Sequence, residues 1–259
     1  MNRPLQSLLI QIYSAVKKTG FLQTRMGEAI FDHFYLGYKK YLEARDIHLL
    51  KRFYIPGSHI IDIGANIGFF TEHFAKWVAP TIGGVIAIEP EPENYARLNK
   101  RLTRLKLQDY VSTIQAAVAD VSGPLHLMVN PEHPGDHQLA ETGLPVNGIT
   151  IDDIIRQKQW PDVSLIKIDV QGAETRVIHG ARETLLRLQP TLYIEVSETD
   201  LNRHGSSSEK LVNLLGSLNY EMDPSYNNDD FSGSLSDDAN AYRDILFRPA
   251  RSYLNTKEP

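Results

Sequence analysis

The sequence contains no cysteine among its 259 residues. This absence excludes a disulfide framework, a zinc site built from thiolates and a cysteine nucleophile. Proteins without cysteine suit a reducing compartment, so we expect a cytoplasmic location.

Long hydrophobic runs are missing as well. The apolar stretch at residues 5–12 is too short and too polar to span a bilayer. It also lacks the unbroken apolar core and the small-residue cleavage site of a signal peptide. Its apolar residues follow helical spacing, which predicts a helix that packs on the main domain or on a partner subunit. We therefore expect no transmembrane segment.

Basic residues are in the minority. Lysine and arginine total 27 against 32 aspartates and glutamates, for a net charge of −5. A chain of this charge is not expected to coat nucleic acid through general electrostatics, so we expect no nucleic-acid partner. The hydrophobic fraction of 42% is that of an ordinary globular protein. The length suits one sizeable domain with additions.

The break at Pro56-Gly57 divides the chain into two parts. Residues 1–56 are predicted to be mostly helical and form an N-terminal extension. This extension is a candidate lid over a binding pocket or a candidate homodimer interface. Residues 57–259 form the main domain.

The main domain alternates strand-like and helix-like stretches. Its apolar runs lack polar alternation, which is typical of parallel strands that helices bury on both faces. The pattern predicts an α/β fold with a doubly wound, mostly parallel, seven-stranded sheet and a terminal antiparallel strand. The expected strands are 59–63, 84–89, 111–119, 164–170, 191–196, 220–222 and 244–247, with an extra strand at 123–129. The expected helices are 69–78, 93–105, 151–157, 173–188 and 208–218.

A glycine-containing turn follows the first of these strands. Gly64 and Gly68 stand four residues apart between a strand and a helix, where a ligand can approach the backbone closely. The spacing differs from the G-x-G-x-x-G loop that cradles a pyrophosphate. Asp62 precedes the turn, and its carboxylate opposes a pyrophosphate but suits the ammonium of a methionine group. These features favour S-adenosylmethionine (SAM) over NAD.

Glu89 ends the second strand, 27 residues after Asp62, and is followed by Pro90. A carboxylate at this place accepts hydrogen bonds from both ribose hydroxyls, a need that SAM and NAD share. The small residues around Ala117 are expected beside the adenine. The complete set of expected cofactor-binding residues is Asp62, Gly64, Ala65, Asn66, Gly68, Phe69, Glu89, Pro90, Ala117 and Asp169.

Four blocks of residues 55–250 resemble the FkbM-type SAM-dependent methyltransferases. The blocks lie at 61–71, 87–90, 149–154 and 165–174. The last reads L-I-K-I-D-V-Q-G-A-E, where the family commonly has Glu at the place of Gln171. The resemblance implies a class I methyltransferase fold, which is Rossmann-like, with SAM as donor. It also implies an acceptor hydroxyl on a sugar or polyketide-like molecule.

Methylation of a hydroxyl needs a general base or a metal ion, because a protonated hydroxyl is a poor nucleophile. Asp169 and Glu195 end neighbouring strands, and Glu198 lies just beyond, so these three are candidates for one rim that binds Mg²⁺. The alternative is a metal-free role for Asp169. His137, in a polar loop, is the leading candidate for the general base.

The sequence thus predicts a SAM-dependent O-methyltransferase with catalytic residues His137, Asp169 and Glu195. The expected acceptor is a hydroxyl of a sugar, a glycan or a small natural product. Two alternatives stay open: an N- or C-methyltransferase acting on another small molecule, and a SAM-binding module without catalysis.

Overall fold

The computed structural model describes residues 46–130, 137–226 and 242–250. Most of the predicted N-terminal extension lies outside the described residues, so its expected role as lid or dimer interface stays a prediction. No helix within the described ranges has the length and apolar character needed to cross a membrane.

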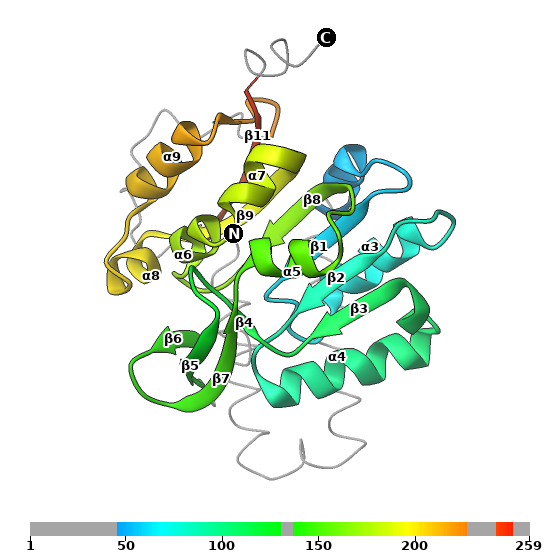
Figure 1. Ribbon diagram of the computed structural model, residues 1–259, viewed down its shortest axis with the longest axis horizontal. Helices are drawn as coiled ribbons and strands as arrows, with labels where there is room; N and C mark the ends of the chain where they lie inside the picture. The colour runs from blue at the N-terminus through cyan, green and yellow to red at the C-terminus, as the bar shows by residue number, and fades with distance from the viewer. Residues whose placement is uncertain (1–45, 131–136, 227–241, 251–259) are drawn as a thin grey trace, which may run out of the picture.

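A seven-stranded sheet forms the centre of the molecule (Figure 1). Its strand order is β10-β11-β9-β8-β1-β2-β3. Neighbouring strands are parallel except β11, which runs antiparallel to both β9 and β10. The predicted doubly wound, mostly parallel sheet is confirmed. Its strands are β1 His59–Ile63, β2 Val85–Ile88, β3 Val111–Ile114, β8 Val163–Ile168, β9 Thr191–Ser197, β10 Tyr220–Met222 and β11 Tyr242–Pro249.

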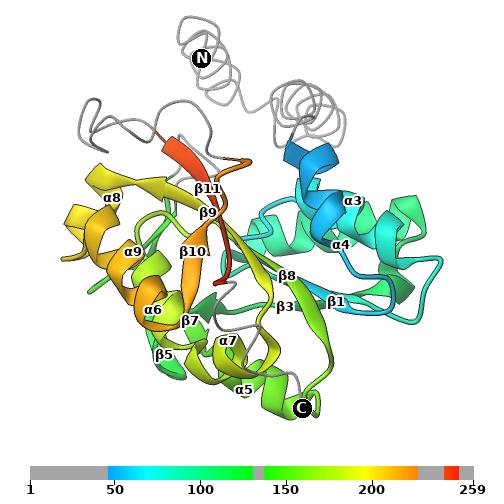
Figure 2. The same ribbon diagram turned by 90° about the horizontal axis from the view of Figure 1, so that it is seen from above.

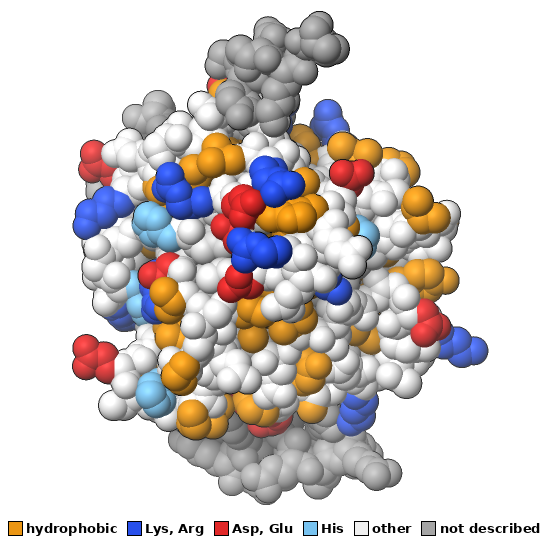
Figure 3. All heavy atoms as spheres, in the orientation of Figure 1, with side chains coloured by type: hydrophobic (Ala, Val, Ile, Leu, Met, Phe, Trp, Pro, Cys, Tyr) orange, Lys and Arg blue, Asp and Glu red, His pale blue; other side chains and the backbone are white. Residues whose placement is uncertain are grey.

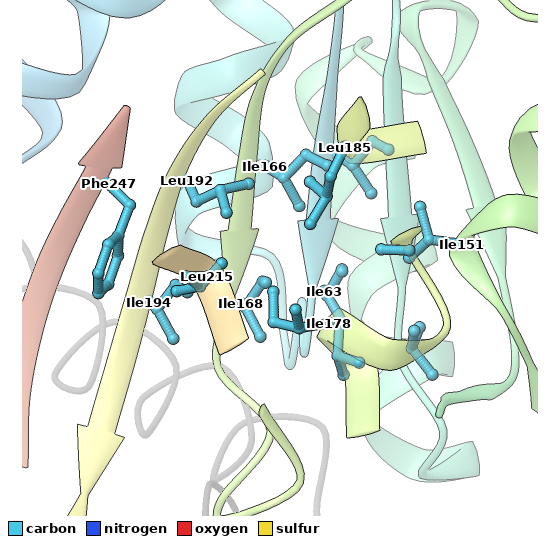
Figure 4. Packing of buried hydrophobic residues seen from close by; sticks show 14 of the residues in the cluster. Ile63, Ile151, Ile166, Ile168, Ile178, Leu185, Leu192, Ile194, Leu215 and Phe247 are labelled. Carbon is cyan, nitrogen blue, oxygen red and sulfur yellow. The ribbon is translucent and has the colours of Figure 1, made fainter. Parts of the chain in front are cut away.

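Helices cover both faces of this sheet, as the views in Figures 1 and 2 show. One face packs isoleucines of β1, β2 and β8 against the apolar sides of α5, α6, α7 and α9, and part of this cluster is drawn in Figure 4. The other face packs against α3 and α4. The helices are α3 Phe69–Val78, α4 Pro92–Leu105, α5 Ile151–Gln157, α6 Glu174–His179, α7 Arg182–Leu188, α8 Glu198–Arg203 and α9 Ser208–Ser217.

A second, four-stranded sheet follows β3 in the chain, in the order β4-β7-β5-β6. The predicted strand 111–119 is therefore wrong in its second half. The main sheet keeps β3, whereas β4 pairs with β7 in the second sheet. The extra strand at 123–129 is confirmed as β5. The strands are β4 Ala117–Val118, β5 Gly123–Met128, β6 Gln138–Ala140 and β7 Leu144–Ile149.

The predicted helix 173–188 is also wrong, because it is divided at Gly180 into α6 and α7. A Cβ at Gly180 would lie 2.1 Å from the carbonyl oxygen of Ala119. The same glycine accepts a hydrogen bond at its carbonyl from the N–H of Asp152, at 2.9 Å. The helix therefore breaks where it meets the loop after β4 and the start of α5.

Acidic and basic side chains are interspersed on the face of the molecule drawn in Figure 3. On α5 and α7 they form ion pairs. Arg156 lies 2.7 Å from Asp153 and 3.0 Å from Glu183, and Arg187 lies 2.9 Å from Glu183. These exposed pairs stabilise the fold by little.

Candidate active site at the switch point of the sheet

Strand order reverses between β1 and β8, and the glycine-containing turn lies at this switch point. Open α/β sheets bind their ligands beyond the carboxyl ends of the strands at such a point. The N–H groups of Gly64 and Ala65 both donate to the carbonyl of Ile88, each at 3.0 Å. Gly64 has a φ of +73°, and a Cβ there would lie 1.8 Å from the carbonyl oxygen of Asp169. Only glycine allows the turn to lie this close to the end of β8.

Glu89 is buried beside this turn, with 4% of its surface exposed. Its Oε2 accepts the N–H of Asn66 at 2.8 Å, and its Oε1 accepts the N–H of Glu91 at 3.0 Å. Burial raises the pKa of Glu89 to about 7, and these two backbone hydrogen bonds oppose that rise. An ionised carboxylate has about four acceptor sites, so two donors leave it able to accept a diol.

A pocket opens in front of Glu89 and encloses about 590 Å³ of empty space, solvent at its mouth included. One wall is apolar and comes from β2 and the second sheet. The residues of this wall are Ile88, Ala116, Ala117, Val118, Leu127 and Leu139.

Six of the ten expected cofactor-binding residues line this pocket: Gly64, Asn66, Glu89, Pro90, Ala117 and Asp169. The other four lie behind it. Gly68 has a φ of +88° and is the N-cap residue of α3, and Phe69 packs against Phe70. Ala65 is buried within the turn. These residues shape the loop and not the surface that a ligand meets.

Asp62 is fully buried and is absent from the pocket lining. Its Oδ2 accepts the hydroxyl of Thr71 at 2.6 Å, and its Oδ1 lies 3.7 Å from the Nζ of Lys167. Burial raises the pKa of Asp62, and Lys167 opposes this rise. The carboxylate of Asp62 therefore links β1 to α3 and β8 beneath the turn. We had expected it to contact the ligand instead.

The carboxylates of Asp169 and Glu195 lie at the ends of β8 and β9. The buried Lys167 donates to Oδ2 of Asp169 at 3.1 Å and forms an ion pair with it. Gln171 donates from its Nε2 to Oδ1 of Asp169 at 3.1 Å and to Oε2 of Glu195 at 3.0 Å. One amide thus joins the two carboxylates.

The structure gives no support to the expected Mg²⁺ site. Glu198 is the first residue of α8, and its Oε2 accepts the N–H of Ser208 at 3.0 Å, at the start of α9. It therefore does not share a rim with Asp169 and Glu195. Within the described ranges, no group of three or more His, Asp or Glu side chains is placed to hold a metal ion.

His137 lines the pocket just before β6. Its Nδ1 accepts the N–H of Asn130 at 3.1 Å. An imidazole that accepts at Nδ1 carries its proton on Nε2, which makes Nε2 a donor in this tautomer. The general-base role expected for His137 stays a prediction. The next residue, Gln138, donates to Oδ1 of Asp200 at 3.1 Å and thereby ties β6 to α8.

Several pocket residues could not be predicted from the sequence. Leu127 reaches the pocket from β5, where Leu125 and Leu127 alternate with His126, and Leu139 reaches it from the short strand β6. Gln171 was noted for its departure from a family pattern, but its contacts depend on β9, which lies far away in the chain. Asn94 enters the lining from the first turn of α4 without any sequence signal.

Residues 62–222 match the family model described as "Methyltransferase FkbM domain". The match spans more than half of the chain and includes the glycine-containing turn, Glu89, His137, Asp169 and Glu195. The chain belongs to the FkbM methyltransferase family. The resemblance in its sequence motifs is therefore confirmed.

Three curated relatives are distant. The "31-O-demethyl-FK506 methyltransferase FkbM" of Streptomyces tacrolimicus is 28% identical over 162 residues, which is 49% of this chain and 61% of that protein. The "Hexuronic acid methyltransferase AglP" of Haloferax volcanii is 25% identical over 126 residues, 48% of this chain and 50% of that protein. The "2-O-methyltransferase NoeI" of Sinorhizobium fredii is 28% identical over 182 residues, 63% of this chain and 73% of that protein.

This FkbM family chain spans only 61% and 50% of the first two of these relatives. Among solved structures, the methyltransferase FkbM from Methylobacillus flagellatus is similar at 20% identity and a TM-score of 0.46. That match covers 74% of this chain and 43% of the other.

Proposed function

We propose that this FkbM family chain transfers a methyl group from SAM to a hydroxyl of a sugar, a glycan or a small natural product. The observation that carries the proposal is the position of Glu89. Its carboxylate is held by two backbone N–H groups and lines one pocket together with Asp169. The pocket thus presents a diol-binding carboxylate and a second carboxylate for an acceptor.

The donor side of the pocket matches the parts of SAM. Glu89 accepts the ribose hydroxyls, and the apolar wall at Ala117 and Leu127 receives the flat adenine ring. Gly64 and Asn66 present the turn to the amino-acid portion. When bound, SAM supplies a methyl group on a positively charged sulfur.

The acceptor side contains Asp169, which lines the pocket. Gln171 joins it to Glu195, which is not part of the pocket lining. Asp169 accepts a hydrogen bond from the acceptor hydroxyl and takes its proton, which readies the oxygen to receive a methyl group. SAM, when bound, would supply that methyl group, and its sulfur would keep the electron pair of the carbon–sulfur bond. Nε2 of His137 donates a hydrogen bond that orients the acceptor, so much of the rate comes from positioning.

The names of the relatives support an oxygen acceptor. One relative is named a 2-O-methyltransferase, one acts on a hexuronic acid, and one methylates a 31-O-demethyl compound. These names describe those proteins. For this chain the hydroxyl acceptor is our proposal.

Calorimetry with SAM, S-adenosylhomocysteine and NAD tests the donor. We expect binding of the first two and none of NAD by the full-length protein. The variant Glu89→Ala should lose most of this affinity, and Glu93→Ala, at an exposed position on α4, is the matched control. Binding of NAD with its diphosphate on residues 64–68 would contradict the donor assignment.

Release of S-adenosylhomocysteine across a panel of hydroxyl, amine and carbon acceptors tests the reaction. Turnover with hydroxyl acceptors alone supports the O-methyltransferase. Turnover with amines or carbon nucleophiles instead supports an N- or C-methyltransferase. Tight SAM binding without turnover on any acceptor supports a binding module.

A further inference from the structure

We propose that the amide of Gln171 holds the carboxylates of Asp169 and Glu195 together, in the place that a divalent cation would otherwise take. The inference rests on the proposed function in treating Asp169 as the acceptor side of the pocket, with Glu195 behind it as a partner of Gln171. It makes Gln171 a positioning residue that acts through its two carboxylate partners.

The hydrogen bonds of the amide carry this inference. Nε2 of Gln171 lies 3.1 Å from Oδ1 of Asp169 and 3.0 Å from Oε2 of Glu195. An amide nitrogen has two hydrogens, so each carboxylate receives one of them. Two carboxylates this close repel each other unless a proton, a cation or a shared donor lies between them. Here the shared donor is neutral.

The backbone at Gln171 gives the side chain a set direction. Gln171 has a φ of +51°, a left-handed conformation that is uncommon for a residue with a Cβ, and 9% of its surface is exposed. Gly172 follows with a φ of +96°, and a Cβ there would lie 2.5 Å from the carbonyl oxygen of Asp200. The turn is therefore locked against α8, and this packing maintains the strained backbone at Gln171.

Lys167 completes the arrangement on the other oxygen of Asp169. Its Nζ lies 3.1 Å from Oδ2 of Asp169, whereas Gln171 contacts Oδ1. Both oxygens of this carboxylate are thus oriented by named donors from two directions. An acceptor hydroxyl then meets lone pairs whose directions are set before it binds, without a metal ion to arrange them.

The donor set does not fit a divalent cation. Mg²⁺ prefers oxygen ligands, and the two amide hydrogens point to the oxygens that a bridging cation would bind. Replacing the amide by a carboxylate removes those hydrogens and adds an oxygen ligand. Gln171→Glu should therefore convert the group into a cation site.

A Mn²⁺ titration of the full-length protein tests this expectation. Gln171→Glu should bind Mn²⁺ saturably, at least about tenfold more tightly than the wild type. The matched control is Gln108→Glu, which makes the same charge change at an exposed glutamine whose Nε2 lies 3.4 Å from Oδ2 of Asp109. This control should bind Mn²⁺ no better than the wild type.

A second variant covers the case in which Gln171→Glu fails to fold. Gln171→Met keeps the side-chain length and removes both donors. Its unfolding temperature should fall below that of wild type in about 10 mM salt and approach it in about 1 M salt, because salt screens the repulsion between the two carboxylates. A purely steric role for Gln171 would give the same deficit at both salt concentrations, which would overturn the inference.

Two further outcomes would overturn the inference. The first is Mn²⁺ binding by the wild type that is lost in Asp169→Asn, because it would mean that the amide turns its oxygen toward the carboxylates. The second is an affinity of Gln171→Glu for Mn²⁺ that equals that of Gln108→Glu. Calorimetry with S-adenosylhomocysteine on the wild type tests the proposed function separately. If the wild type does not bind S-adenosylhomocysteine, the proposed function fails, but the comparison of Mn²⁺ affinities between the variants remains valid.

Discussion

The buried carboxyl group of Glu89 predicts that S-adenosylhomocysteine binds more weakly in mild acid. Burial raises its pKa to about 7, so the group gains a proton just below neutral pH. Ribose hydroxyls donate hydrogen bonds, and an ionised carboxylate is a stronger acceptor than a protonated one. Ligand binding and proton binding at Glu89 therefore oppose each other.

The size of the effect follows from the pKa. If the ligand binds the ionised form, its apparent affinity falls about tenfold for each pH unit below the pKa of the free protein. The affinity at about pH 6 should then be roughly tenfold below the plateau that it reaches above about pH 8, a difference of about 1.4 kcal/mol.

Calorimetric titrations of wild type and Glu89→Gln across this pH range measure the effect. The glutamine has no proton to lose, and its NH2 group meets one of the two N–H groups of Asn66 and Glu91, so the affinity of this variant should be low at every pH. The exposed Glu93→Gln variant should keep the wild-type curve. A flat wild-type curve, or an equal slope in Glu89→Gln, would refute the role of Glu89 at the ribose.

Three further predictions follow from local geometry. Burial raises the pKa of Glu174 from 4.5 to about 7. Because the folded-state pKa is raised, the protein loses stability as the pH rises from about 4.5 through 7. Denaturant unfolding of Glu174→Gln should therefore match wild type near about pH 4.5 and exceed it by on the order of 3 kcal/mol near pH 9. Gly64→Ala should destabilise the protein by about 3 kcal/mol or more, because its Cβ meets the backbone of Asp169. The control Gly205→Ala, at a φ of +71° with open space around it, should cost only about 1 kcal/mol in the same unfolding assay. His137→Ala removes the donor that orients the acceptor, so it should lower kcat by about 100-fold and leave the calorimetric affinity for S-adenosylhomocysteine nearly unchanged. An unchanged kcat would remove His137 from the reaction.

The central elements of the fold could be predicted from short stretches of sequence. The boundaries of β1, α3 and α5 agree with the prediction to the residue. The reason is local in each case. Thr150, for example, is an extended N-cap residue whose hydroxyl accepts the N–H of Asp153, and the apolar residues of α5 follow it at helical spacing. Such signals need no information from distant parts of the chain.

The errors lie where distant segments meet. The division of helix 173–188 depends on the contact between Gly180 and the carbonyl of Ala119. The second sheet depends on pairing of β4 with β7, which are separated by β5 and β6 in the chain. Neither contact leaves a periodic trace in the sequence, and helical spacing continues across Gly180.

The same distinction separates the two sides of the candidate site. The place of Glu89 at the end of β2 could be predicted because it follows from the strand pattern, whereas its hydrogen bond from Asn66, 23 residues away in the chain, could not. The place of Asp62 could not be predicted, because its burial depends on Thr71 and Lys167, which come from two other elements. A strand pattern identifies the carboxyl end of a strand but not which acids there reach the pocket.

The acceptor side combines segments that only folding brings together. Gln171 needs Glu195 from the next strand, and His137 is placed by a segment whose neighbour, Gln138, is anchored to α8 through Asp200. The second sheet thus supplies a wall of the donor pocket and carries His137, while α8 fixes both Gln138 and the turn after Asp169. A change at Asp200 should therefore disturb His137 and Gln171 together, although the pocket lining does not include Asp200.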